Sequence, residues 1–444
     1  MSKIKLSDHF TYKRLLRFVF PTIIMMMFTS IYGVVDGFFV SNFVGKTPFA
    51  ALNLVMPFVM ILGGMGFMIG TGGSALVAKE LGLGNRDRAN RYFTLLIYFT
   101  IALGLVLSAI GVIFIRPVSI FLGATESMIE SAVLYGRITT GFTVSFMLQN
   151  VFQSFLAAAE KPRMGLRVTV AAGLTNAVLD ALFIIVFKWG LAGAALATGI
   201  GQCVGGIIPL IYFMRKNSSL LRLTKPKFEL KPIVKACTNG SSELMSNISS
   251  SIVGMLYNWQ LIRLIGENGV SAYGVLMYVQ FIFIAIPIGY SIGTAPLVSF
   301  NYGAGNHTEM KNLLKKSIIL NAVTGITLTV LAISLSSPLA HIFVGYDREL
   351  YDLSVSAFKL FSLAFILDGL NIFASGFFTA LNNGLVSAVI SFLRTLVFQT
   401  SSIIVLPIIL GPDGIWLANT VAQVFAFIIS LIFLIALRKR YKYF

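Results

Sequence analysis

Four acidic residues stand inside long apolar stretches of this sequence, where a charge is costly. They are Asp36, Asp180, Glu243 and Asp368. An ionisable side chain in such a stretch is a functional candidate because it must bind or pair with something to offset the loss of water. Asn176 precedes Asp180 by four residues, so the two side chains face the same side of a helix.

Three polar residues are expected at a similar depth. Asp36 lies nine residues before Gly45, at the predicted end of its helix, and Thr198 lies eight residues after Gly190. Asp180 stands eight residues before Lys188. Two carboxylates, the Asn176 amide and a hydroxyl form an all-oxygen set, which suits a hard monovalent cation. The same two carboxylates suit a single shared proton, since buried carboxylates resist double ionisation. Hydrogen bonding between neighbouring helices is the structural alternative.

The acids in the second half of the chain are weaker candidates for binding a cation or substrate. Asp368 is expected near the middle of its helix, whereas Glu243 stands close to one end. Arg394 is expected at a depth comparable to that of Glu243, so an ion pair that serves packing explains Glu243 equally well. Pro21 falls on the helix that carries Asp36 and removes a backbone hydrogen bond, which permits the helix to bend.

The elements that carry these residues are too apolar for a water-soluble fold. Hydrophobic residues make up 57% of the 444 residues and charged residues 11%, against roughly 45–50% and about 25% in soluble proteins. Twelve apolar blocks have the length of a helix that crosses a bilayer. They begin near residues 15, 49, 91, 127, 163, 191, 236, 270, 311, 350, 385 and 414. We expect an all-α integral membrane protein with twelve transmembrane helices.

The positive charge of the chain predicts its orientation rather than a nucleic-acid partner. Of the 34 Lys and Arg residues, 26 fall in the two termini and the even-numbered loops, and only five in the odd-numbered loops. By the positive-inside rule, both termini are cytoplasmic. The three His residues are scattered, the two Cys lie in or beside predicted helices, and the segment ending in Gly45-Lys46-Thr47 lacks the first glycine of a P-loop. We therefore expect no enzyme, no cofactor and no resident metal.

The sequence repeats itself at an offset of 221 residues. The recurring residues include Gly82-Leu83-Gly84-Asn85 with Gly303-Ala304-Gly305-Asn306, Asn150 with Asn371, Gly193 with Gly414, Gln202 with Gln423, and the GxxxG pairs Gly66/Gly70 and Gly289/Gly293. An even number of helices in each half predicts parallel repeats that enclose a central cleft. We expect two six-helix lobes, residues 1–214 and 236–444, joined by a basic cytoplasmic linker, residues 215–235.

The chain resembles the multidrug and toxic compound extrusion (MATE) family, and within it the bacterial drug-efflux branch. The resemblance spans the whole length and rests on the motifs Val35-Asp36-Gly37-Phe38-Phe39-Val40, Ala51-Leu52-Asn53-Leu54, Gly82-Leu83-Gly84-Asn85, Gly190-Leu191-Ala192-Gly193-Ala194-Ala195 and Asn301-Tyr302-Gly303-Ala304-Gly305-Asn306. It implies a cation site at Asp36, Asn176, Asp180 and Thr198, a bending proline at Pro21, and coupling or substrate roles for Glu243 and Asp368.

The function that the resemblance implies is antiport. Organic cations and lipophilic drugs leave the cell in exchange for protons or sodium, by alternating access, in a monomer of the bacterial cytoplasmic membrane. A flippase of lipid-linked oligosaccharides is the alternative, although such flippases often have more helices and a basic cavity. The sequence does not choose between sodium and proton, and it does not identify the drug.

Overall fold

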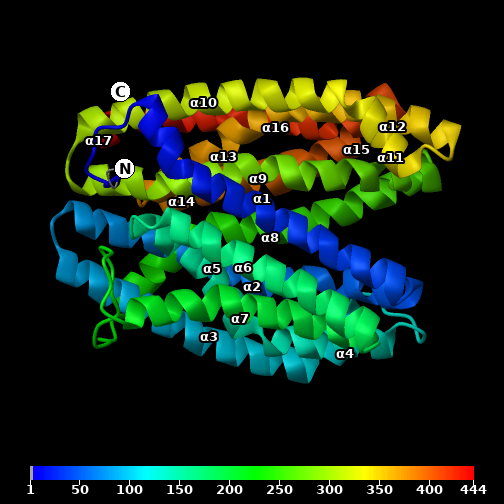
Figure 1. Ribbon diagram of the computed structural model, residues 1–444. Helices are drawn as coiled ribbons and strands as arrows, with labels where there is room; N and C mark the ends of the chain where they lie inside the picture. Colours follow the sequence, from blue (N-terminus) through cyan, green and yellow to red (C-terminus); the bar gives the residue numbers. More distant parts are fainter. Residues whose placement is uncertain (1–3) are drawn as a thin grey trace.

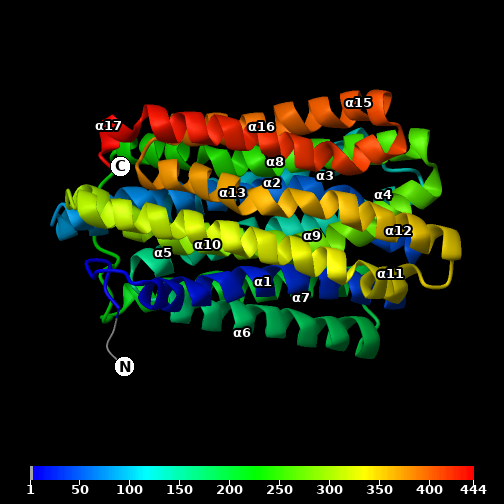
Figure 2. The same cartoon turned by 90° about the horizontal axis from the view of Figure 1, so that it is seen from above.

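Long, nearly parallel helices make up the computed structural model, which describes residues 4–444 (Figures 1 and 2). No strand occurs within that range. The α-helices are α1 (Tyr12–Phe43), α2 (Lys46–Gly82), α3 (Arg86–Phe121), α4 (Ile129–Gly141), α5 (Thr143–Ala158), α6 (Pro162–Asp180), α7 (Gly190–Met214), α8 (Leu230–Leu264), α9 (Glu267–Gly303), α10 (His307–Ser334), α11 (Ser336–Val344), α12 (Arg348–Phe361), α13 (Phe365–Ala380), α14 (Gly384–Phe392), α15 (Gln399–Leu410), α16 (Pro412–Ala436) and α17 (Arg438–Tyr441).

Twelve membrane-length rods emerge from these helices. Ten helical segments of the described chain are long and apolar enough to cross a membrane. The other two rods are α8, which is rich in Ser and Asn, and the pair α4 and α5, which is interrupted at Phe142. A π-helical segment, Ala181–Val186, extends α6, and a second one, Leu393–Phe398, joins α14 to α15. The all-α membrane fold expected from the apolar blocks is confirmed.

The internal repeat is visible in how the two halves of the chain touch. A Cβ atom added to Gly82 would lie 2.0 Å from the carbonyl oxygen of Phe300, and one added to Gly303 would lie 2.2 Å from that of Lys79. Both partners of the first contact recur in the second at the offset of 221 residues. This reciprocal contact is what a twofold relation between the halves requires. The repeated helices therefore also pack against each other as a pair.

The repeated GxxxG motifs confirm close helix packing but serve two different contacts. A Cβ atom on Gly66 would lie 2.7 Å from Cα of Met147 on α5 in the same half of the chain. A Cβ atom on Gly289, its counterpart, would lie 2.6 Å from Cα of Ile23 on α1 in the other half. One motif thus holds a half together, whereas the other joins the two halves.

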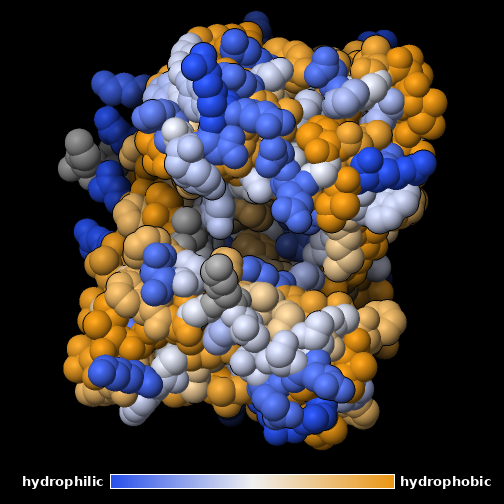
Figure 3. Space-filling model, turned by 90° about the vertical axis from the view of Figure 1, so that its right-hand side faces the viewer, coloured by the Kyte–Doolittle hydropathy of each residue, from blue (hydrophilic) through white to orange (hydrophobic). Residues whose placement is uncertain are grey.

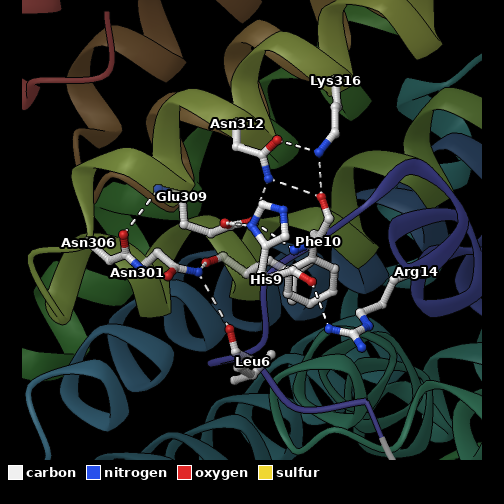
Figure 4. A network of polar contacts seen from close by, with 10 residues as sticks. Leu6, His9, Phe10, Arg14, Asn301, Asn306, Glu309, Asn312 and Lys316 are labelled. Carbon is white, nitrogen blue, oxygen red and sulfur yellow. Dashed lines mark hydrogen bonds and ion pairs between the residues drawn. The ribbon is translucent and has the colours of Figure 1, made fainter.

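An N-terminal strap, residues 4–11, ties the two halves together at the end of the bundle where the termini lie (Figure 4). The backbone N–H of Leu6 donates to Glu160 Oε1 at 2.9 Å, and that of Phe10 donates to Glu309 Oε1 at 3.0 Å. His9 Nδ1 lies 2.7 Å from Glu309 Oε2. Because Glu160 belongs to the first half and Glu309 to the second, the strap spans both.

The opposite end of the molecule is hollowed. Figure 3 looks onto this end and shows a deep depression between the two halves, with hydrophobic residues at its floor. The glycine contacts and the strap close the end with the termini, whereas the far end is open. The described chain therefore stands in a conformation that is open on one side only.

Candidate functional site

A chain of polar contacts joins three helices near the hollowed end. The Thr198 hydroxyl on α7 donates to Asp36 Oδ1 on α1 at 3.3 Å. The Asn176 amide on α6 donates to Thr198 Oγ1 at 3.5 Å. Asp36 and Asn176 are buried, with exposed fractions of 4% and 2%. The structure thus brings together residues that stand far apart in the sequence.

Asp180 completes this group as a buried carboxylate without a hydrogen-bond donor. Its side chain is fully buried, and neither carboxylate oxygen has a hydrogen-bond partner in the structure. Asn176 Oδ1 also lacks a donor, and Asp180 interacts electrostatically with Asp36. Among the described side chains, no Lys or Arg forms an ion pair with either acid. Buried oxygens with unused lone pairs are the ligands that a hard cation or a proton would satisfy.

The local backbone helps to place Asp180. It is the last residue of α6, and the π-helical segment Ala181–Val186 follows directly. Insertions of this kind are frequent at functional sites because they redirect side chains. The apolar pattern of the sequence gave no signal for it, since a π-helical turn has no distinct residue preference here.

One aromatic residue beside the site was not anticipated from the sequence. Tyr135 on α4 is 1% exposed and interacts electrostatically with both Asp36 and Asp180. It stands in a stretch of moderate hydropathy, where a tyrosine carries no mark of function. Its repeat partner at the 221-residue offset is Ser356, so the repeat offers no signal either.

The acids of the second half lie in a different electrostatic setting. Asp368 on α13 is 3% exposed, and its Oδ2 atom lacks a hydrogen-bond donor. Arg394, on the second π-helical segment, is buried and interacts electrostatically with both Asp368 and Glu243. No ion pair within 4 Å joins Arg394 to either acid among the described residues. A positive charge therefore offsets this second pair of acids, whereas Asp36 and Asp180 have none.

Pro21 is buried inside α1, fifteen residues before Asp36, and the helix runs through it unbroken. Since proline has no N–H, the carbonyl of Arg17 loses its partner there. The next two residues, Thr22 and Ile23, contact Gly289 of α9. The weakest point of α1 is therefore also the point where it meets the other half. Within the described chain, no group of three or more His, Cys, Asp or Glu could hold a metal ion.

Comparison with known proteins identifies relatives of the whole chain. The family model MatE matches residues 21–182 and 244–404. Those two segments begin 223 residues apart, in agreement with the internal repeat. The multidrug export protein MepA of Staphylococcus haemolyticus is 24% identical over 97% of this chain and 94% of its own length. MepA of Staphylococcus aureus strain COL is 26% identical over 86% of this chain and 84% of its own length.

The fold also matches a solved structure. A multidrug resistance MATE family transporter of the MOP superfamily, in an outward-facing conformation, superposes with a TM-score of 0.93. The match covers all of this chain and 99% of the other, at 21% sequence identity. The likeness shows that the two chains share their fold.

Proposed function

Because this chain belongs to the MatE family, we propose that it is a multidrug exporter that moves organic cations and lipophilic drugs outward in exchange for protons or sodium. The chain is a membrane transporter of the MepA-like branch and not an enzyme. The curated relatives that cover nearly all of it are named multidrug export proteins, and that name is the ground for the substrate class.

The observation that carries the coupling role is the group of buried oxygens at Asp36, Asn176, Asp180 and Thr198. Two carboxylates without a counter-charge are costly in the membrane interior. Binding a proton or a sodium ion as the co-transported substrate removes that cost. The second pair of acids carries Arg394 as an electrostatic partner, so we assign coupling to the first half. Glu243 and Asp368 remain candidates for substrate contact.

The scheme we propose is alternating access between the two lobes, residues 1–214 and 236–444, joined by the linker at residues 215–235. The described conformation, open at the hollowed end, corresponds to the outward-facing state if the termini are cytoplasmic, as the basic loops indicate. Cation binding and drug binding would favour opposite states, and this difference in affinity is what couples the two fluxes. Bending of α1 at Pro21 is the movement that would link the cation site to the contact between the lobes.

The test is dye efflux from energised vesicles that contain the purified protein. Ethidium is loaded, and the sodium and proton gradients are collapsed one at a time with selective ionophores. The proposal expects efflux that stops when one of the two gradients is removed. Efflux that persists without either gradient would contradict antiport, and no efflux under any gradient would contradict drug export.

A further inference from the structure

A basic hollow lies at the end of the bundle that carries the termini, far from the candidate cation site. It has a volume of about 650 Å³ and is lined by the start of α10, by α17 and by the last residues of the chain. The lining residues are His307, Lys311, Arg438, Lys439, Lys442 and Phe444. Five of these six side chains carry or can accept a positive charge, and none carries a side-chain carboxylate.

The charges of this hollow have no partner in the described protein. None of its Lys and Arg side chains takes part in an ion pair among the described residues. His307 Nδ1 is buried and lacks a hydrogen-bond partner. A second hollow at the same end, about 500 Å³ in volume and lined by Arg17, Arg163 and Arg167, includes Glu160 as a counter-charge. Clustered like charges repel one another, so the first hollow is the one that calls for an external anion.

The wall of the hollow is built rather than loose. Tyr443 is 1% exposed, and its hydroxyl donates to the carbonyl oxygen of Leu434 at 2.9 Å. Its ring packs against Phe377 at 5.3 Å between centroids. Lys442, the residue before it, has a left-handed backbone with φ of 54°, a conformation that costs free energy for a residue other than glycine. This turn buries Tyr441 and Tyr443 and leaves Lys442 and Phe444 exposed at the hollow.

Apolar side chains border the same charges. Leu431 and Ile435 on the last turns of α16 are 44% and 48% exposed, and Lys439 follows Ile435 by four residues. Phe444 is 60% exposed beside the hollow. A row of exposed apolar groups that ends in a cluster of cations matches a lipid, whose acyl chains lie along the helix and whose phosphate lies at the membrane surface.

From this geometry we propose that the hollow binds the phosphate headgroup of an anionic glycerophospholipid, with Lys311, Lys439 and Lys442 as its principal contacts. Lys and Arg bind phosphate through charge-assisted hydrogen bonds. The lipid would join the start of α10 to the end of α16. This proposal concerns the membrane surface alone and stands whether or not drug export is coupled to a cation.

The test measures lipid binding to the full chain by native mass spectrometry after titration with short-chain phosphatidylglycerol or phosphatidylcholine. The variant carries K311Q, K439Q and K442Q. Loss of three surface charges should weaken phosphatidylglycerol binding by about tenfold or more and leave phosphatidylcholine binding unchanged. A variant with K311R, K439R and K442R keeps the charges and should bind as the unmodified chain does.

The matched control carries K225Q, K227Q and K231Q, three exposed lysines in the linker at the same end of the bundle. It should retain phosphatidylglycerol binding, because those residues lie outside the hollow. Equal loss of binding in both variants, or no loss in the first, would overturn the site. Inorganic phosphate is titrated separately as a competitor. If it displaced the lipid at an equal concentration, the assignment to a lipid rather than to free phosphate would be wrong.

Discussion

Thr198 donates its hydroxyl hydrogen to Asp36 across 162 residues of sequence, and this 3.3 Å contact joins α7 to α1. A hydrogen bond to an ionised carboxylate is stronger than one between neutral groups. The contact therefore orients one of the two acids that we assign to the coupling cation. Thr198 is a positioning and ligand candidate that can be changed without removing a charge.

Replacing Thr198 by Ala should weaken the response of transport to the driving cation. Losing one hydrogen bond to a charged group costs about 1.5–3 kcal/mol, so the cation concentration at half-maximal ethidium efflux should rise roughly tenfold or more. The T198S variant retains the hydroxyl and should behave as the unmodified chain does. Equal responses of T198A and T198S would show that the hydroxyl takes no part.

Replacing Pro21 by Ala should restore the hydrogen bond to the Arg17 carbonyl and stiffen α1. Removing a proline from a helix interior relieves a cost of about 3 kcal/mol, so the melting temperature should stay equal or rise while ethidium efflux falls. Thermal unfolding and efflux are measured on the same preparation. A variant that is less stable and less active to the same degree would point to packing alone.

Replacing Gly82 by Ala should disturb the contact between the two halves. The added methyl would meet the carbonyl of Phe300 at 2.0 Å, and overpacking of this kind costs about 1–3 kcal/mol. The G303A variant should have a similar effect, because its contact with Lys79 is the reciprocal one. The control is G274A on α9, where an added Cβ meets nothing within 4 Å. A fall in melting temperature that is equal in all three variants would contradict the contact.

Replacing Glu309 by Gln should loosen the N-terminal strap. Glu309 holds His9 and the Phe10 N–H (Figure 4), and the amide keeps only one acceptor oxygen and no charge. Hydrogen exchange of the amides at residues 6–10 should speed up by roughly tenfold. The control is E349Q, an exposed first-turn acid of α12. Unchanged exchange at residues 6–10 in E309Q would show that the strap is held by other contacts.

The sequence predicted the scaffold well because membrane-length apolar blocks and repeated glycines leave few alternatives. It also placed Asp36, Asn176 and Thr198 at one depth, since distance along a helix translates directly into depth. Depth does not specify which side chains meet, however. Neither the electrostatic interaction of Arg394 with Asp368 nor the π-helical turn after Asp180 follows from residue spacing. These features depend on how the helices rotate and pack.

The repeat predicted the fold better than it predicted the contacts. Gly66 and Gly289 are equivalent in sequence, yet Gly66 packs within its own half and Gly289 packs against α1 of the other half. An equivalent position in a twofold repeat has an equivalent contact only where both halves adopt the same arrangement. Here the chemistry is also unequal, because Asp36 corresponds to Tyr257 at the 221-residue offset. The polar site therefore had to be found in the structure of one half.

The central claim is that Asp36 and Asp180 bind the coupling cation. Its most direct test compares gradient-driven ethidium efflux in vesicles that contain the D36N variant, the D180N variant, or D352N, which alters an exposed aspartate of α12. We predict that D36N and D180N abolish the efflux driven by the cation gradient while the purified variants still bind ethidium, and that D352N is unaffected. Efflux by D36N and D180N that remains as dependent on the gradient as that of the unmodified chain would contradict the claim.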